Sequence, residues 1–419
     1  MQIDEQRLVE RFMRYVRIDT QSADAEQERF PSTDKQLNLS RLLVDELRSM
    51  GLEDAMIDGH GYVMATLPAN VECGAPVLGL LAHVDTSPDA PGAGVQPRLV
   101  DYAGGDIMLN AERGIALRRA DFPELNRYVG QRLVVTDGTT LLGADDKAGV
   151  AEIMEAVAYV QEHPELRHGT VRIAFTVDEE VGRGVDCFDV QRFGAHYAYT
   201  IDGGALGEFE HANFNAAHAT VRFVGRNIHP GYAKGKMLNA MLLAMEFNAQ
   251  LPERERPEHT EGTEGFFHLT SLSGEVECCT AHYIIRDHDA ARFEARKELL
   301  RTIARRMDSI YGPGTVQLQL TDQYRNMGDL LPADSLSVRM ALQAMRSVGV
   351  EPLVRPIRGG TDGARLTYMG LPCPNIFAGG ENFHSCFEYV PVPSMMRATA
   401  VIVALMELYG QLSIGEWQK

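Results

Sequence analysis

The sequence predicts an α/β protein in which a smaller α+β domain is inserted into the chain of a larger domain. Short apolar runs, typical of buried strands, alternate with helical patterns in the first and last parts of the chain. The middle part follows the order β-α-β-β-α-β, the split, ferredoxin-like arrangement of a small domain. The length of 419 residues suits two domains. We expect the larger domain to comprise residues 1–207 and 322–419, and the inserted domain residues 208–321.

The first part of the chain predicts three helices and three strands. A helix is expected over 4–15, and a second one after a capping segment at 31–33, ending at Gly51. Buried strands are expected over 77–82, 170–177 and 198–201, and a further helix over 148–161. Between them, residues 88–130 form a Gly-, Asp- and Arg-rich segment that exceeds a normal connection, so it should be functional or self-structured.

The remaining elements follow in order. The inserted domain should contain strands at 217–224, 266–273, 278–286 and 315–321 and helices at 239–251 and 290–310. After it, strand-helix alternation resumes with a helix at 335–348, a strand at 375–378 and a closing helix at 394–411.

Composition excludes some classes of function. The net charge of -18 argues against binding to nucleic acid or to an anionic membrane, because phosphate surfaces would repel the protein. No apolar run approaches the length of a membrane span, and the first ten residues are polar, so we expect a cytoplasmic protein. The six cysteines show no CxxC pair and are expected to be reduced thiols.

Side chains that can bind metals follow four predicted strands of the larger domain and precede the helix expected over 148–161. Open α/β sheets place ligands at the carboxyl ends of their strands, so these side chains should lie along one edge. They occur in His83-Val84-Asp85, Gly143-Ala144-Asp145-Asp146-Lys147, Asp178-Glu179-Glu180, Asp202-Gly203-Gly204 and Gly380-Glu381-Asn382-Phe383-His384.

Each of these residues has an ordinary alternative explanation when it is taken alone. His83 could be a satisfied histidine at a strand end, and Asp145 could be a helix N-cap. Asp202 could belong to a simple turn. Three adjacent acids at the end of a buried strand would repel one another unless a cation lies nearby. Five such segments at one sheet edge favour a site over these separate explanations.

The set of side chains indicates the chemistry. Histidine and carboxylate without thiolate suit zinc, cobalt or manganese. Two histidines and three carboxylates are too many for one tetrahedral zinc but suit two metals that share a bridging carboxylate and hold a water between them. A free glutamate beside a ligand glutamate could then take the proton of that water.

The motifs resemble those of the peptidase T family, which are tripeptide aminopeptidases within a superfamily of two-zinc aminoacylases and carboxypeptidases. The resemblance extends over nearly the whole chain, including the segment 88–130. It rests on His83-Val84-Asp85-Thr86-Ser87-Pro88, Leu141-Leu142-Gly143-Ala144-Asp145-Asp146-Lys147-Ala148-Gly149, Asp178-Glu179-Glu180-Val181-Gly182, Thr200-Ile201-Asp202-Gly203-Gly204, Asn227-Ile228-His229-Pro230-Gly231, Arg286-Asp287 and Gly359-Gly360-Thr361-Asp362-Gly363.

The resemblance implies a zinc-peptidase-like catalytic domain that binds two zinc ions per chain, with the inserted domain as a lid. Asp145 would bridge both metals. His83 and Asp202 would complete the ligands of one metal, and Glu180 and His384 those of the other.

It also implies roles for residues that are not metal ligands. Asp85 would orient His83, and Glu179 would be the general base, which the sequence alone could not distinguish from Glu180. His229 of the lid would stabilise the tetrahedral oxyanion, and lid closure would bring it to the substrate. A cis peptide bond is expected between Asp145 and Asp146.

Three further residues are candidates for substrate binding. Arg286 and Arg358 would hold the carboxylate of the peptide, where a planar guanidinium can bind with two hydrogen bonds. Asn326 would help to position the peptide backbone. The alternatives are that Arg286 pairs with a nearby aspartate and that Arg358 stabilises a glycine-rich loop.

One motif departs from the family pattern. After the last histidine the family usually has glycine and then a basic residue, whereas here His384 is followed by Ser385 and Cys386. This leaves the side-chain preference and the strict preference for tripeptides open. We interpret Cys386 as a packing residue.

The resulting expectation is an enzyme that releases the amino-terminal residue from short peptides, foremost tripeptides, by attack of a zinc-bridged water. An N-acyl amino acid deacylase or a dipeptidase of the same superfamily is the alternative within this chemistry. A non-catalytic peptide-binding protein is the alternative outside it, although no ligand is lost. Short peptides are the expected partners, and both a monomer and a homodimer remain open.

Overall fold

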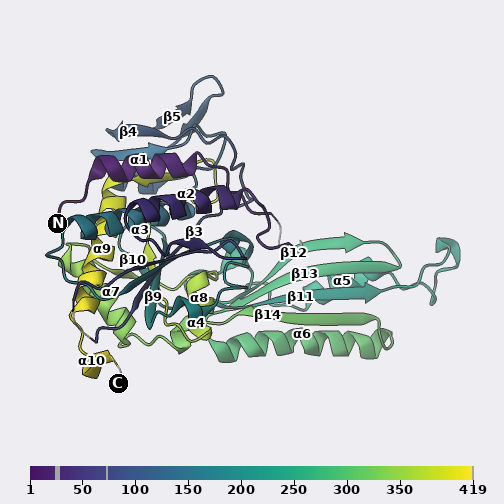
Figure 1. The fold of residues 1–419 in the computed structure, drawn as a ribbon. Helices are drawn as coiled ribbons and strands as arrows, with labels where there is room; N and C mark the ends of the chain where they lie inside the picture. The colour runs from purple at the N-terminus through teal and green to yellow at the C-terminus, as the bar shows by residue number, and fades with distance from the viewer. Residues whose placement is uncertain (24–28, 72–73, 418–419) are drawn as a thin grey trace. The chain divides into compact units, whose positions relative to one another are not determined.

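The computed structural model describes residues 1–23, 29–71 and 74–417. The chain divides into two compact units, each described separately below (Figure 1). The larger unit comprises Met1–His211, Leu330–Arg355 and Thr361–Lys419, and the smaller unit comprises Ala212–Asp329 and Pro356–Gly360.

The larger unit is built on an eight-stranded sheet. Its strands are β1 (Met56–Ile57), β2 (Val63–Leu67), β3 (Leu78–His83), β8 (Val171–Thr176), β9 (Tyr197–Gly203), β10 (Glu208–Glu210), β15 (Leu353–Val354) and β16 (Asn375–Phe377). They lie in the order β1-β2-β8-β3-β9-β16-β10-β15. The central strands β8, β3, β9 and β16 are parallel, whereas β2 joins β8, and β10 joins β16, in the antiparallel sense. The carboxyl ends of the four central strands therefore share one edge.

Helices cover this sheet. They are α1 (Glu5–Val16), α2 (Gln36–Ser49), α3 (Ala144–Glu162), α4 (Val190–Phe193), α7 (Leu336–Ser347), α8 (Asp362–Tyr368), α9 (Val392–Gly410) and α10 (Ile414–Trp417). α3 packs against β3 and β9 and also against α1 and α9. Because it is covered on several sides, α3 is buried along most of its length. This burial explains its low amphipathicity, since a helix that is apolar all round belongs to a core.

Of the described helices, α9 alone is long and apolar enough to cross a membrane by length and composition. It packs against α3 and α7, and most of its residues are buried in the larger unit. Its apolar character is therefore accounted for by the core of the fold.

The segment 88–130 is self-structured, which is one of the two alternatives that its length predicts. It contains β4 (Arg98–Tyr102), β5 (Ile107–Asn110), β6 (Ile115–Leu117) and a 3-10 helix, η1 (Pro123–Tyr128), and leads into β7 (Gln131–Val135). β4 and β17 (Tyr389–Pro391) pair with the two edges of β7. A separate apolar cluster, which includes Leu117, Leu125, Tyr128, Leu133 and Tyr389, holds this part together.

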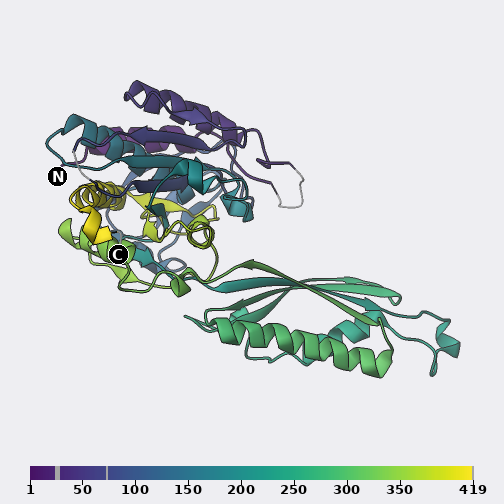
Figure 2. The ribbon, with the colours of Figure 1, turned by 60° about the horizontal axis from the view of Figure 1, so that its bottom comes forward.

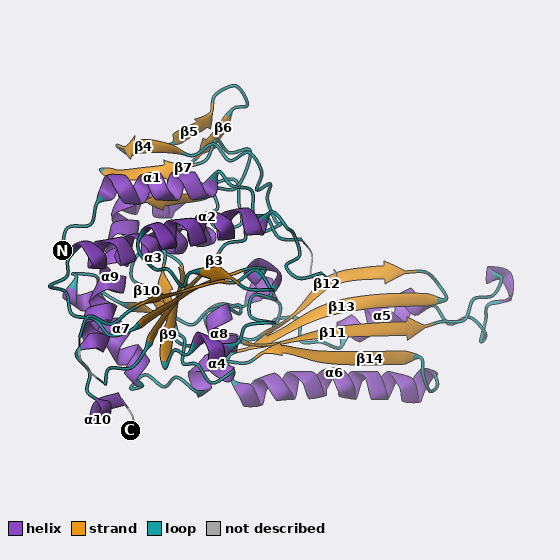
Figure 3. Ribbon diagram, in the orientation of Figure 1, coloured by secondary structure: helices purple, strands orange, loops and turns teal. Residues whose placement is uncertain are grey.

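The smaller unit has the predicted ferredoxin-like order. It contains β11 (Asn215–Val224), α5 (Ala240–Ala249), β12 (Phe266–Gly274), β13 (Cys278–Asp287), α6 (Ala290–Tyr311) and β14 (Val316–Tyr324). Its four strands lie in the order β12-β13-β11-β14 and are antiparallel throughout (Figure 3). Both long helices lie on the same face of this sheet (Figure 2).

The two faces of the smaller sheet differ in burial. Along β13, buried and half-buried residues alternate, as expected for a strand with one covered face. Cys279, Ala281 and Tyr283 are buried in the cluster that the helices cover. The intervening side chains, which include His282 and Arg286, form the face without helices.

The unit boundaries differ from the expected insert of 208–321. β10 stays with the larger unit because it pairs with β16. β14 continues to Tyr324, beyond the expected end, since it pairs with β11 as far as Ala216. Pro356–Gly360 joins the smaller unit, where Phe214 N–H donates to Ile357 O at 3.1 Å.

All the helices and strands that the sequence predicts are present, with ends shifted by a few residues. The expected capping segment of α2 is an exception. α2 begins at Gln36 without a side-chain cap, and the hydroxyl of Ser32 instead donates to Asp178. Short elements such as β1, β10, β15 and α8 were not predicted, because they are too short to show a period of their own.

Candidate metal centre

The predicted strand ends meet at one edge of the larger sheet. His83 is the last residue of β3, Asp202 lies near the end of β9, and Glu180 follows β8 in a short 3-10 helix, η2 (Glu179–Val181). Asp145 lies in the first turn of α3, and the peptide bond between Asp145 and Asp146 is cis. His384 follows β16, with a backbone φ of 60°.

One group of possible metal ligands consists of His83, Asp145 and Asp202. Nε2 of His83 lies 3.0 Å from Oδ1 of Asp145 and 3.5 Å from Oδ1 of Asp202. One ligand atom from each residue lies within 4.8 Å of the other two. The three side chains are largely buried, so the group is shielded from solvent.

A second group shares Asp145 with the first. Nε2 of His384 lies 2.8 Å from Oε2 of Glu180 and 3.3 Å from Oδ2 of Asp145. Asp145 therefore faces the first group with Oδ1 and the second with Oδ2. The structure brings together all five residues predicted as ligands, with Asp145 between the two groups as a bridging carboxylate would lie.

Both histidines are oriented by groups on their Nδ1 side. Nδ1 of His83 lies 3.1 Å from the backbone oxygen of Asp85 and 3.3 Å from its carboxylate. Nδ1 of His384 lies 3.2 Å from both Asp89 Oδ2 and Ser87 Oγ. These contacts direct each Nε2 toward the carboxylates, as is usual for histidines that bind metals. The sequence predicted Asp85 for this role but not Ser87 or Asp89.

The three consecutive acids after β8 point in different directions. Asp178, at a φ of 58°, accepts hydrogen bonds from Ser32 and Gln36 and so turns away from the ligand groups. The N–H groups of Glu179 and Glu180 donate to the two carboxylate oxygens of Asp85, at 3.1 and 3.2 Å. Asp85 thus fixes both His83 and the backbone that carries Glu179 and Glu180.

Electrostatics within the cluster favour a bound cation. Burial raises the pKa of Glu180 to about 8 and that of Asp202 to about 6. Hydrogen bonds to Asp145 and Glu180 raise the pKa of His384 to about 11. Carboxylates that are buried close together resist ionisation, and a metal ion in contact with them reverses this effect because it is the largest local charge.

The residues fit a pair of metal ions. Ligands of a tetrahedral zinc at about 2.0–2.1 Å lie roughly 3.3 Å from one another, close to the distances of 2.8–3.5 Å within both groups. Oε1 of Glu180 is buried and has no hydrogen-bond partner among the described residues. A buried carboxylate oxygen without a donor is costly unless a cation occupies the space beside it.

Glu179 lies next to these groups without belonging to either. Burial, and then the charge of Asp202, raise its pKa well above the usual value. Asp362, a buried residue at the start of α8 whose carboxylate accepts from Thr176 Oγ1 at 2.8 Å, adds to this effect. A carboxyl whose pKa is raised in this way is a stronger base than an exposed glutamate and is suited to accept and return a proton.

A further buried carboxyl joins two loops of the centre. Glu388 is 2% exposed and accepts hydrogen bonds from the N–H groups of Leu142, Gly143 and Asp145. Burial raises its pKa to about 7. The sequence did not predict these contacts, because nothing in the local pattern links Glu388 to residues 243 to 246 positions earlier in the chain.

The loop after His384 contains the departure from the family motif. Ser385 Oγ donates to Asn382 O at 2.7 Å and accepts from Phe387 N–H at 3.2 Å, so its side chain closes a local turn. Cys386 is half-buried and carries a free thiol whose pKa is raised by burial. Neither side chain belongs to the ligand groups.

The other four predicted residues lie in the smaller unit. His229 is exposed, and its Nδ1 accepts the N–H of Gly231 at 3.1 Å. The guanidinium of Arg286 donates to Gln323 and lies over the ring of Tyr324. The structure therefore does not pair Arg286 with Asp287, whose carboxylate instead binds Arg296 at 2.7 Å.

Arg358 and Asn326 are engaged within the smaller unit itself. Arg358 donates to Gly262 O at 2.7 Å and stacks on Phe214 and Phe266. Asn326 is 3% exposed, and its side chain binds backbone groups of Asn213, His288 and Gly328. The contacts of Arg358 favour the alternative that it stabilises a loop, and the roles of Arg358 and Asn326 in substrate binding stay predictions.

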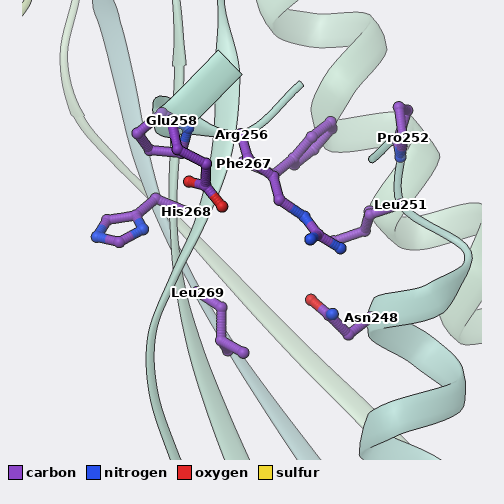
Figure 4. Close-up of a pocket in the computed structure, with 9 residues that line it drawn as sticks. Asn248, Leu251, Pro252, Arg256, Glu258, Phe267, His268 and Leu269 are labelled. Carbon is purple, nitrogen blue, oxygen red and sulfur yellow. The ribbon is translucent and has the colours of Figure 1, made fainter. Parts of the chain in front are cut away.

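The smaller unit also has a surface pocket of about 250 Å³ beside α5 and β12 (Figure 4). Its polar groups include Arg256, Glu258, His268 and Asn248, and its apolar ones include Leu251, Phe267 and Leu269. None of its lining residues is one of the predicted site residues.

Comparisons with known proteins agree with the motifs. Residues 211–315 match the family described as a peptidase dimerisation domain. A protein of Geobacillus kaustophilus named peptidase T is 55% identical over 97% of this chain and 99% of its own length. One of Parabacteroides distasonis with the same name is 53% identical over 97% of this chain and 100% of its own.

Solved structures share the fold. An aminopeptidase from Bacillus cereus covers 98% of this chain and 100% of its own, with a TM-score of 0.77 and 24% identity. A tripeptidase from Staphylococcus aureus covers the same shares, with a TM-score of 0.79 and 20% identity. A Bacillus subtilis protein with a TM-score of 0.64 and 12% identity is described as a dinuclear metal-binding peptidase.

Proposed function

We infer that this chain, which belongs to the peptidase T family, is a metal-dependent aminopeptidase that releases the amino-terminal residue from short peptides, foremost tripeptides. One observation carries the inference. Two groups of possible metal ligands share Asp145, and Glu179, a carboxyl outside both groups, lies beside them. A paired metal site with an adjacent base is the arrangement that hydrolyses amide bonds.

We propose that the centre holds two zinc ions. His83, Asp145 and Asp202 would hold one ion, and Asp145, Glu180 and His384 the other. When bound, such ions polarise the scissile carbonyl and lower the pKa of a water to near neutrality. The mixture of nitrogen and carboxylate ligands supports zinc, although cobalt and manganese accept similar sets. The metal content of purified protein tests the identity of the ion.

Glu179 is the proposed general base and general acid. Its raised pKa suits a group that accepts a proton from the attacking water and returns it to the leaving amine. Asp85 holds the backbone N–H of Glu179, which keeps this carboxyl in place beside the ligand groups. Asp85 is therefore proposed as a positioning residue for both His83 and Glu179.

His229 is the proposed donor to the tetrahedral oxyanion. Because Nδ1 accepts the N–H of Gly231, the neutral imidazole carries its proton on Nε2. Nε2 can therefore donate a hydrogen bond to negative charge that develops on the carbonyl oxygen. Arg286 is the proposed partner of the peptide carboxylate, and Arg358 and Asn326 are proposed to support the substrate-binding surface.

The experiment that tests the function compares three substrates: a free tripeptide, the corresponding dipeptide and the N-acetylated tripeptide. Each is assayed with zinc and after chelation. The expected result is metal-dependent release of the amino-terminal residue from the free tripeptide alone. Cleavage of the acetylated peptide would assign the chain to deacylation, and preferred cleavage of the dipeptide would assign it to the dipeptidases.

We propose a cytoplasmic location, because the five cysteines among the described residues are free thiols. Cell fractionation tests this. The match of residues 211–315 to a peptidase dimerisation domain supports a homodimer over a monomer. Sedimentation of the purified protein distinguishes the two states.

A further inference from the structure

We propose that Glu388 is a positioning residue that fixes the loop carrying His384 to the loop carrying Asp145 and so sets the geometry of the second ligand group. The inference rests on the proposed metal centre. It assigns a role to a buried side chain that is neither a ligand nor the base.

The contacts of Glu388 use both of its carboxylate oxygens. Oε2 accepts the N–H groups of Leu142 and Gly143 at 2.8 and 2.7 Å, and Oε1 accepts the N–H of Asp145 at 3.0 Å. Gly143 has a φ of 80° and Asp145 a non-helical conformation, so this stretch precedes the regular turns of α3. Glu388 therefore binds three N–H groups of an irregular loop, including that of the bridging ligand itself.

The other end of the connection is the loop that carries His384. Glu388 N–H donates to Ser385 O at 3.3 Å, one residue after His384. The next residue, Tyr389, begins β17 and pairs with Val135 of β7. Glu388 therefore extends from a fixed strand, and its carboxylate holds the Asp145 loop at a set distance from that strand and from His384.

The second ligand group depends on this connection more than the first does. Asp145 and His384, two of its three members, lie in the two loops that Glu388 joins. His83 and Asp202 lie at the ends of adjacent parallel strands, where the sheet itself fixes their positions. A change in Glu388 should therefore alter the two groups unequally.

The number of acceptors makes the carboxylate necessary. An amide has one acceptor oxygen, so glutamine at this position would turn its NH₂ group toward at least one of the three N–H donors. The loop must then move, because the NH₂ group and a backbone N–H are both hydrogen-bond donors and cannot bind each other. Groups that orient metal ligands typically change metal affinity by about 10–100-fold when they are replaced.

The test is a titration of the metal-free full-length protein with Co²⁺, followed by the visible absorption of the bound ion. Wild type is expected to bind two equivalents. In Glu388→Gln the first equivalent should bind within about threefold of wild type, whereas the second should bind about 10–100-fold more weakly, with an altered spectrum. Glu388→Asp, which keeps two acceptor oxygens on a shorter side chain, should give an intermediate affinity.

Glu381→Gln is the matched control. Glu381 is a carboxyl of the same loop, but it accepts from Tyr128, and an amide oxygen can do the same. This variant should bind both equivalents as wild type does.

The outcomes separate the inference from the proposed function. If wild type bound no metal, the proposed metal centre would be wrong. If wild type and Glu388→Gln both bound two equivalents with equal affinity and equal spectra, only the role of Glu388 would be refuted. A lower melting temperature with unchanged Co²⁺ binding would show a merely structural role. If neither Glu388 variant folded even with saturating Co²⁺, the role of Glu388 would likewise be merely structural.

Discussion

The two units treat their buried charges differently. In the larger unit, Glu152 is fully buried in α3, and neither of its carboxyl oxygens has a hydrogen-bond partner among the described residues. In the smaller unit, Lys297 is 4% exposed but binds Asp322 at 2.8 Å and Glu294 at 2.7 Å. The larger unit thus contains, beside paired carboxylates such as Glu155, a buried carboxyl that no described side chain pairs, whereas the buried Lys297 of the smaller unit is paired.

This difference matches the division of chemistry between the units. The carboxylates of the candidate metal centre lie close together, and such a cluster binds a cation strongly because the ion removes the electrostatic cost of their mutual repulsion. The smaller unit instead carries the proposed oxyanion donor His229, which follows β11 in a unit with an apolar cluster of its own. Substitutions in the larger unit should therefore alter catalysis or metal binding, and those in the smaller unit should mainly alter substrate recognition.

Glu179→Ala, a substitution in the larger unit, should have the largest effect on activity. It tests whether catalysis depends on a group of that unit that does not bind metal. Loss of the general base should lower kcat by about 10²–10⁴-fold, while two metal ions remain bound. Steady-state kinetics and metal analysis of the same preparation measure both. The assignment of the base would be wrong if the variant kept more than a tenth of wild-type kcat.

His229→Ala tests the exception to this division between the units. A loss of catalysis in this variant would place a catalytic group in the smaller unit. Loss of an oxyanion donor should lower kcat by about 10²–10³-fold with little change in KM. His259→Ala, an exposed histidine of the same unit, serves as the control and should behave as wild type. A rise in KM alone would make His229 a binding residue.

Arg286 and Arg358 should differ from each other. Arg286→Lys should raise KM for a free tripeptide by about 10-fold or more, because hydrogen bonds to charged groups contribute about 1.5–3 kcal/mol. Arg358→Lys should lower thermal stability instead, since its guanidinium holds Gly262 O and Thr260. The KM for the corresponding tripeptide amide provides the check. This substrate lacks the terminal carboxylate, so Arg286→Lys should not raise its KM.

The smallest expected effect concerns the stability of the larger unit. Burial raises the pKa of Glu152 well above 4.5, so above that pH the folded state holds a proton that the unfolded state has released. Stability due to this group therefore falls as pH rises. Glu152→Gln removes this dependence, so its free energy of unfolding relative to wild type should increase as the pH rises from 5.5 to 7.0. Urea unfolding at the two pH values measures it, and a pH-independent difference would contradict the prediction.

The proximity of the proposed ligands could be predicted from the sequence because parallel strands bring their carboxyl ends together. His83, Asp202 and Glu180 each follow a run of buried apolar residues, and that local pattern places them at one edge. The same reasoning could not show that Asp178 turns toward Ser32 and Gln36, because that pairing joins positions about 140 residues apart.

Residues that support the ligands were harder to predict for a related reason. Asp89 and Glu388 contact groups in other loops, and loops carry no periodicity from which their packing can be predicted. The unit boundaries near β10 and β14 also depended on pairing between distant segments. Sequence patterns thus located groups at the ends of regular elements and missed those that connect irregular ones.

The position of β16 has a consequence for the newly made chain. β16 lies between β9 and β10 in the sheet, although it is synthesised after the whole of the smaller unit. At about 5–20 residues per second, a ribosome needs roughly 9–35 s to pass from Ile201 of β9 to its partner Ile376. During that interval the contiguous Ala212–Asp329 segment can fold, but the larger sheet is incomplete and His384 has not been made. With His384 as a proposed ligand, we expect the nascent chain to hydrolyse peptides only after the segment with β16 and His384 has emerged, so the order of synthesis delays activity until the larger sheet is complete.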